Sequence, residues 1–258
     1  MGFQARAADV FGSFNTEGHY TVAPSGASEL DFEQDLFGAL RFAKRGQAAL
    51  LMPFVETRRQ LGGATEFGGG IGDINLSGRY DFTLAQEQRY IPGIALLAGI
   101  TLPTGRPVDQ ARTPLATGAT GAGTFQGTVG IAVEQAYGHW LLNLTGLLAA
   151  RTTRSVQGIR ETLGLQFTGL AAAAYAFGND AGIALLASYA VEGSATINGA
   201  EDPATARRVL QVALAGVYPL TDRWRLQGSM FFNPPLSGFG RNQPSLAGTS
   251  LAVVRSWL

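Results

Sequence analysis

Apolar and polar side chains alternate with a period of two along most of this sequence, and this alternation limits the possible folds more than any other feature. The segment 71–82 shows it clearly. Its polar positions are Asp73, Asn75, Ser77, Arg79 and Asp81, and its apolar positions are Ile74, Leu76, Tyr80 and Phe82. Successive side chains of a strand point to opposite faces, whereas a helix would mix the two sets. The segment is therefore predicted to be a strand with one wet and one apolar face.

Similar segments recur between Gly, Pro and polar breaks. They predict strands near 11–22, 30–43, 48–58, 71–82, 91–102, 124–135, 140–151, 162–177, 181–193, 209–220, 224–233 and 245–257. The connections alternate between short and long, and the longest spans 103–123. Outer-membrane barrels have short periplasmic turns and long outer loops, so we predict an all-β fold, a transmembrane antiparallel up-and-down β-barrel of about 12 strands. A barrel of about ten strands with a periplasmic tail is the alternative.

The composition agrees with a wall that faces lipid. Charged residues make up 15% of the chain and hydrophobic residues 46%, whereas a soluble domain has about 25% charged residues. The longest near-apolar run, 91–103, is interrupted by Pro92, Gly93 and Gly99, and a membrane helix needs about 20 apolar residues. A helical membrane protein is therefore not expected.

Aromatic side chains on the apolar parity gather beside the predicted short turns, where an amphipathic ring would meet both lipid and water. These residues are Phe42, Tyr80, Phe82, Trp140, Tyr175, Phe177, Tyr218 and Trp224. They predict an aromatic girdle at one rim of the barrel. A soluble sandwich or lipocalin gives no reason for such a girdle.

The chain is predicted to form a single barrel domain over residues 11–258, preceded by a periplasmic segment, residues 1–10, that could plug the lumen. An even number of strands with periplasmic turns places both termini in the periplasm of a Gram-negative bacterium. Residues 2–10 lack the pattern of a signal peptide, so Met1 is interpreted as the start of a mature chain.

The wet faces of the predicted strands would line the lumen. The candidates are Glu17, His19, Asp31, Glu33, Asp35, Arg41, Glu56, Asp73, Arg79 and Arg225. Strands five and eight to ten contribute small inward residues instead, so the lumen is predicted to be two-sided. Such a wall suits amphipathic solutes. The segment 1–10 or the loop 103–123 could close it.

The sequence gives little support for catalysis. His19 shares a strand parity with Ser13, Glu17 and Thr21, but a catalytic triad requires mutual contact that spacing alone does not establish. His19 is therefore predicted to be a wall residue. His139 lies beside Trp140 in a tight turn, which favours an interfacial position.

Metal and nucleotide sites are also not expected. Asp31, Glu33 and Asp35 offer oxygen ligands on one face, but calcium needs about six converging oxygens, so a charged wall is the better interpretation. Two distant histidines without cysteine do not make a zinc site. The glycine-rich run 68–72 precedes a strand instead of opening a helix, so it is interpreted as a flexible outer loop. No cofactor is predicted, and the zero net charge indicates no nucleic-acid partner.

Two segments carry a family resemblance: GIGDINLSGRYDF at 70–82 and GITLPTGR at 99–106. They resemble the outer-membrane family named for the meta-pathway of phenol degradation. The resemblance implies an outer-membrane barrel, found with catabolic or transport functions, that passes aromatic or other small molecules. It supplies no catalytic residues.

These observations lead to the hypothesis of an outer-membrane channel for passive diffusion of small, weakly polar or aromatic solutes, not an enzyme. Its expected partners are the lipid bilayer and the solute, and the sequence names no protein partner. A barrel enzyme acting on lipid or peptide and a structural or scaffold barrel remain alternatives. Carboxylates near the loop end, including Asp31, Glu33 and Asp73, predict a mild preference for cations.

Overall fold

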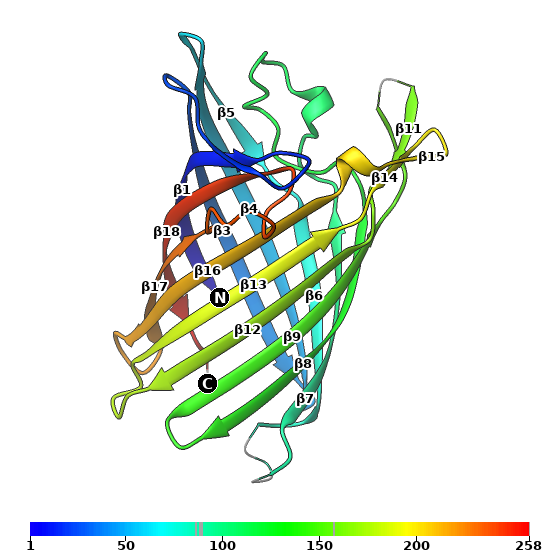
Figure 1. The fold of residues 1–258 in the computed structure, drawn as a ribbon. Coiled ribbons are helices and arrows are strands. Elements are labelled where there is room, and N and C mark those ends of the chain that lie inside the picture. Colours follow the sequence, from blue (N-terminus) through cyan, green and yellow to red (C-terminus); the bar gives the residue numbers. More distant parts are fainter. Residues whose placement is uncertain (86, 88–89, 157, 258) are drawn as a thin grey trace.

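The computed structural model describes residues 1–85, 87, 90–156 and 158–257, and these form a closed antiparallel barrel (Figure 1). Twelve strands make up the ring: β1 (Gly2–Phe14), β3 (Ser28–Phe42), β4 (Gly46–Leu61), β6 (Ile74–Thr83), β7 (Gly93–Leu102), β8 (Gln126–Tyr137), β9 (Trp140–Arg151), β12 (Gln166–Ala176), β13 (Gly182–Glu192), β16 (Arg207–Pro219), β17 (Trp224–Phe232) and β18 (Gln243–Arg255). Each ring strand pairs with the next ring strand along the chain, and β18 pairs with β1 to close the ring. The predicted twelve-stranded up-and-down barrel is confirmed.

Further short elements extend beyond the ring at its loop end (Figure 1). They are β2 (Tyr20–Val22), β5 (Ala64–Ile71), the sheet of β10 (Arg154–Val156), β11 (Ile159–Thr162), β14 (Ala195–Ile197) and β15 (Ala200–Asp202), and the 3-10 helices η1 (Val108–Gln110) and η2 (Pro203–Thr205). No helix in the described part of the chain has the length and apolar character needed to cross a membrane.

Short and long connections alternate around the barrel as predicted. The turn end holds the tight β3–β4, β8–β9, β12–β13 and β16–β17 connections together with one longer connection, residues 84–92 between β6 and β7, and the loop end holds the other long ones. Both termini belong to the turn end, where the Met1 amino group donates a hydrogen bond of 3.1 Å to the Arg255 carbonyl.

The outer surface of the wall is apolar and exposed. Leu36, Leu96 and Ile131 illustrate this face, with exposed fractions of 52%, 46% and 56%. At the turn end the predicted aromatic residues do lie on this face, and rings on neighbouring strands touch: the Trp140 and Tyr175 centroids are 5.1 Å apart. A band of exposed apolar side chains that ends in aromatic rings is the surface that a bilayer covers.

The start of the chain corrects the sequence analysis. Residues 2–10, predicted as a separate segment that could plug the lumen, belong to β1 and pair on both sides, with β18 and with β3. The predicted first strand, 11–22, is instead the end of β1 followed by a turn and the short β2. The N-terminal segment therefore closes the wall and does not fill the barrel.

The glycine-rich run 68–72 was also misassigned, because most of it is strand. Gly68 and Gly69 lie in β5, which pairs with the loop-end half of β4, and Gly72 follows it. A Cβ atom on Gly68 would lie 2.7 Å from the backbone of Thr117. Glycine is required here because the loop that follows β7 packs directly on the backbone of β5.

Candidate functional site

The inner face of the wall defines the candidate site, which is the lumen. On each strand, every second side chain points inward and is shielded from solvent; Asp35 and Ala132, for example, have exposed fractions of 7% and 2%. The side chains between them point outward and include the exposed apolar ones. Six predicted lumen residues lie on the inner parity: Asp31, Glu33, Asp35 and Arg41 on β3, Arg79 on β6, and Arg225 on β17.

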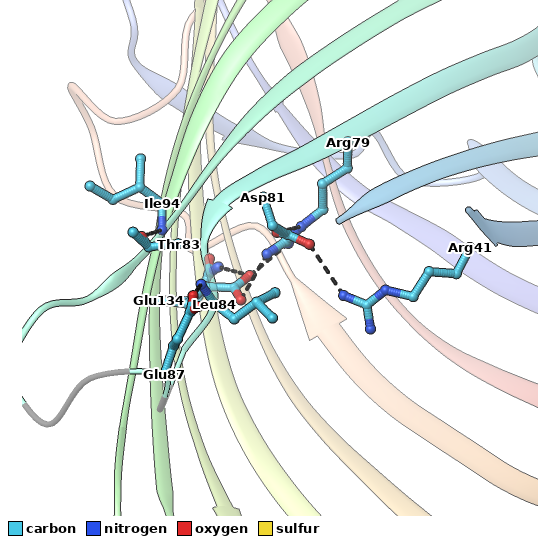
Figure 2. A network of polar contacts seen from close by, with 9 residues as sticks. Arg41, Arg79, Asp81, Thr83, Leu84, Glu87, Ile94 and Glu134 are labelled. Carbon is cyan, nitrogen blue, oxygen red and sulfur yellow. Dashed lines mark hydrogen bonds and ion pairs between the residues drawn. The ribbon is translucent and has the colours of Figure 1, made fainter. Parts of the chain in front are cut away.

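An ion-pair network connects neighbouring strands of the lumen wall near the turn end (Figure 2). The Arg79 guanidinium donates two hydrogen bonds to the Glu134 carboxylate, at 2.7 and 2.9 Å, and its Nε donates to Asp81 at 2.8 Å. Arg41 donates to the other Asp81 oxygen at 3.2 Å, and the Asn143 amide donates to Glu134 at 3.1 Å. The network joins β3, β6, β8 and β9. The two positive charges of the network are matched by the negative charges of Asp81 and Glu134. Arg79 is therefore not available to bind an anion in the lumen.

A second set of ion pairs lies on the inner face of β3, toward the loop end. Arg59 on β4 pairs with Glu29 at 2.8 Å, and Arg6 on β1 pairs with Glu33 at 3.1 Å. The Arg6 guanidinium also lies 4.3 Å from the centroid of the Phe231 ring. Alternate carboxylates of β3 are therefore neutralised by arginines from the strands on either side.

The two remaining carboxylates of this face have no arginine partner in the described structure. Asp31 accepts a hydrogen bond of 2.8 Å from the Thr57 hydroxyl. Asp35 lies midway along β3, opposite Gln4 and Pro53, and its Oδ1 atom has no hydrogen-bond partner among the described residues.

A polar cavity of about 450 Å³ occupies one side of the lumen. Its wall includes the side chains of Gln47, Asn75, Ser77, Gln126, Gln166 and Thr168, from β4, β6, β8 and β12. Apolar residues such as Leu97 and Leu147 and the charged Arg79 also line this cavity. Its neutral polar groups are amides and hydroxyls, and such groups both donate and accept hydrogen bonds.

A second cavity, of about 520 Å³, lies toward the turn end on the other side of the barrel. Its wall is mostly apolar and includes Leu141, Ala174, Ala184, Leu186, Ala213 and Ala215, from β9, β12, β13 and β16. Small side chains leave this space open where larger ones would fill a barrel interior. No residue of the loop 103–123 lines either cavity.

Asp73, predicted to line the lumen, instead holds that long loop. It lies between β5 and β6, and its two carboxylate oxygens accept hydrogen bonds from the backbone N–H groups of Gly105, at 2.8 Å, and Ala122, at 2.7 Å. Farther along the loop, the Leu115 backbone bonds to Glu66 and to Arg59. The loop is thus tied to the β4–β5 hairpin at the loop end, so the prediction that it could plug the barrel finds no support in these contacts.

Replacing Asp73 with alanine is expected to loosen the loop. One hydrogen bond to a charged group contributes about 1.5 to 3 kcal/mol, so hydrogen exchange at the Gly105 and Ala122 amides should accelerate by about tenfold or more. Asp109→Ala is the matched control, because Asp109 is exposed in η1 and makes no side-chain hydrogen bond among the described residues. Unchanged protection of both amides in Asp73→Ala would show that other contacts hold the loop.

Glu17 and His19 do not line the lumen, which corrects another prediction. Both lie in the turn between β1 and β2, with side-chain exposed fractions of 74% and 69%, and they contact each other at 3.3 Å. The wall strand ends at Phe14, because β1 begins at residue 2 and has already crossed the barrel there. The interpretation of His19 as a wall residue is therefore wrong.

Glu56 was placed in the lumen and lies outside it. The β3–β4 register runs without a bulge, so Glu56 keeps the outward parity of Phe54 and accepts a hydrogen bond of 3.4 Å from Gln34 on the same face. It lies beyond Phe54 on the loop side. In the sequence, Glu56 already alternates in step with Phe54, which indicates the outward face. It was assigned to the lumen because it is charged.

Sequence analysis missed several lumen residues. Arg6 and Phe231 meet inside the barrel, but Arg6 fell in a segment that was not assigned to the wall. The signal was present in the alternation of Gln4, Arg6 and Ala8 with Phe3, Ala5 and Ala7. The amides of the polar cavity were also overlooked, because the named polar candidates were limited to charged residues and His19.

The chemistry of a catalyst or metal centre does not assemble in the described residues. Apart from Glu17, His19 has no side-chain partner there, and the His139 ring packs near Tyr175 with their centroids 5.7 Å apart. No group of three or more His, Cys, Asp or Glu side chains in the described residues is arranged to hold a metal ion.

Comparison with known proteins agrees with this architecture. The family model described as "Putative MetA-pathway of phenol degradation" matches residues 12–251. A search of curated proteins finds no match.

Several solved structures share the fold. The COG4313 outer membrane channel from Pseudomonas putida F1 superposes with a TM-score of 0.80 at 14% identity, covering 99% of this chain and 95% of that one. The NanC porin gives a TM-score of 0.57 at 8% identity, covering 99% and 100%. The transport unit of the autotransporter AIDA-I from Escherichia coli gives 0.57 at 8% identity, covering 99% and 90%. At these identities the likeness establishes the barrel fold alone.

Proposed function

Because the chain belongs to the family described as "Putative MetA-pathway of phenol degradation", we propose that it is an outer-membrane channel through which small, weakly polar or aromatic solutes diffuse passively. The single observation that carries this proposal is the pair of cavities inside the barrel, one whose wall presents several amides and hydroxyls and one whose wall is mostly apolar.

The two cavities favour solutes with both a polar and an apolar part. A hydroxyl group could exchange its water partners for Gln47, Ser77 or Thr168 in the polar cavity. An aromatic or aliphatic body would meet Leu141 and Leu186 in the apolar one. Neutral hydrogen-bonding groups compensate the loss of water without the cost of separating an ion pair, because the nearby arginines already have carboxylate partners.

The orientation in the membrane follows from the two ends of the barrel. The turn end carries the aromatic girdle, the tight turns and both termini, and the loop end carries the small sheet of β10, β11, β14 and β15. We place the turn end and both termini in the periplasm and the loop end outside the cell, as in other bacterial barrels. The fold shared with a structure described as an outer membrane channel supports the outer-membrane location.

A substitution that fills the polar cavity should slow permeation. Thr168 faces this cavity, so Thr168→Trp places an indole ring in the space available to a solute, and we expect the swelling rate of protein-containing liposomes in phenol-like solutes to fall several-fold. The matched control is Phe167→Trp on the same strand, because Phe167 points outward and is 52% exposed.

The unmodified protein should admit a small phenolic solute faster than a charged sugar of similar size. If it inserts fully and neither swelling nor ion conductance exceeds that of empty liposomes, the channel proposal fails. If Thr168→Trp and Phe167→Trp slow swelling equally, the polar cavity is not on the path of the solute.

A further inference from the structure

Asp35 is the least compensated carboxylate inside the barrel. Its exposed fraction is 7%, and the Oδ1 atom has no partner in the part of the chain that the structure describes. An ionised carboxylate removed from water without a partner is costly, so such groups usually bind a counter-ion or a hydrogen-bond donor. The Asp35 carboxylate would be stabilised by a cation, and the described residues place none in contact with its Oδ1 atom.

The neighbours of Asp35 explain this deficit. Pro53, opposite on β4, has no N–H group, and Gln4, opposite on β1, makes no side-chain hydrogen bond among the described residues. Arg6 is the nearest arginine in register, but its guanidinium is already engaged by Glu33 and by the Phe231 ring. No cationic side chain of the adjoining strands therefore forms an ion pair with Asp35 in the described structure.

The loop-end half of the inner face of β3 carries an excess of negative charge. Between the loop end and the middle of the strand it presents the carboxylates of Glu29, Asp31, Glu33 and Asp35 against the guanidiniums of Arg6 and Arg59. Since each arginine makes its ion pair with one carboxylate, Asp31 and Asp35 are left without an ion-pair partner of their own in the described structure. A low-dielectric wall strengthens the field of such charges and concentrates counter-ions beside them.

We propose that the carboxylate of Asp35 and the amide oxygen of Gln4 form a binding site for a monovalent cation on the lumen wall. Residues directly opposite on antiparallel strands have Cβ atoms about 4.5 to 5.5 Å apart, so both side chains can reach one ion. Divalent hard cations need about six or more oxygens, and the described residues assemble no such group. A site with two protein oxygens completed by water holds an ion weakly enough to release it.

This inference rests on the proposed channel function and adds a preference for cations to it. It also assigns that preference chiefly to Asp35 and keeps only Asp31 of the three carboxylates that the sequence indicated. Glu33 is neutralised by Arg6, and Asp73 is bonded to loop amides. Asp35, midway along the strand, is the residue left to govern selectivity, with Asp31 beyond it.

The first test measures ion selectivity. In a planar bilayer with a KCl gradient, the reversal potential should show cation preference, and Asp35→Asn should lower the cation-to-anion permeability ratio by about twofold or more, because focused fields change local ion concentrations by about tenfold or more. Glu17→Gln removes the same charge at the exposed β1–β2 turn and should leave the ratio unchanged. Equal ratios for Asp35→Asn and the unmodified protein would overturn the inference.

The second test measures binding without requiring an open pore. Sodium-23 NMR relaxation of the detergent-solubilised protein should show a saturable excess that Asp35→Asn abolishes and Gln4→Leu weakens, while Glu17→Gln retains it. Absence of any saturable excess in the unmodified protein overturns the cation site, even if it conducts. A saturable excess in a protein that neither conducts nor swells liposomes would support the site and contradict the channel, so the two failures are distinguishable.

Discussion

Ile131→Arg is expected to lower the free energy of unfolding by roughly 2 to 4 kcal/mol, the cost of an arginine on the lipid face near the bilayer midplane. Ile131 lies near the middle of β8 on the outer parity and is 56% exposed. A lipid environment cannot solvate the guanidinium at that depth, so its hydration is lost on insertion.

The matched control is Thr128→Arg on the same strand. Thr128 points inward and lines the polar cavity, where water and neighbouring amides can solvate the new charge. Urea titrations of folding into lipid vesicles would give both free energies. Equal losses for the two variants would contradict the assignment of inner and outer faces.

Arg79→Met is expected to cost roughly 3 kcal/mol, since removing one partner of a shielded ion pair leaves the other charge uncompensated. Arg79 is the hub of the turn-end network, and the side chain of Asp81 beside it has an exposed fraction of only 4%. Methionine fills a similar volume but leaves Glu134 without its two guanidinium bonds and Asp81 with Arg41 alone.

Arg225→Met provides the comparison, measured by the same unfolding titrations. Arg225 also faces inward near the turn end, but it is exposed and forms no ion pair among the described residues. A loss below about 1 kcal/mol is therefore expected, as for other exposed charges. If the two methionine variants unfold at the same urea concentration, the network does not stabilise the barrel.

The alternation of side chains predicted the strands because lipid outside and water inside impose opposite chemistry on the two faces of each strand. Where that contrast was strong, as in β6 and β8, the predicted faces agree with the structure. Where alanine occupies both faces, as in β1, the contrast was too weak to separate a wall strand from a terminal segment. The position of the first strand was wrong for this reason.

The candidate site was predictable to a smaller extent. Parity placed Asp31, Asp35 and Arg79 on the inner face, but parity says nothing about which charges meet. Arg79 and Glu134 are separated by 55 residues, and their contact depends on the stagger of strands around a closed barrel. The difference between a neutralised carboxylate such as Glu33 and an unpaired one such as Asp35 therefore required coordinates.

The pairing of β1 with β18 has a consequence for how the molecule forms. Every other neighbouring pair in the ring joins ring strands that follow one another along the chain. The β1–β18 pair instead joins the first and last strands, so that residues such as Gly2 and Val254 lie side by side. Contacts between such distant residues carry a large loop-closure entropy and slow folding. The hairpins can therefore form early, but the ring cannot close until the last strand has been synthesised and delivered. A nascent chain truncated before β18 would expose two unpaired edges, the state that assembly factors and proteases would meet first.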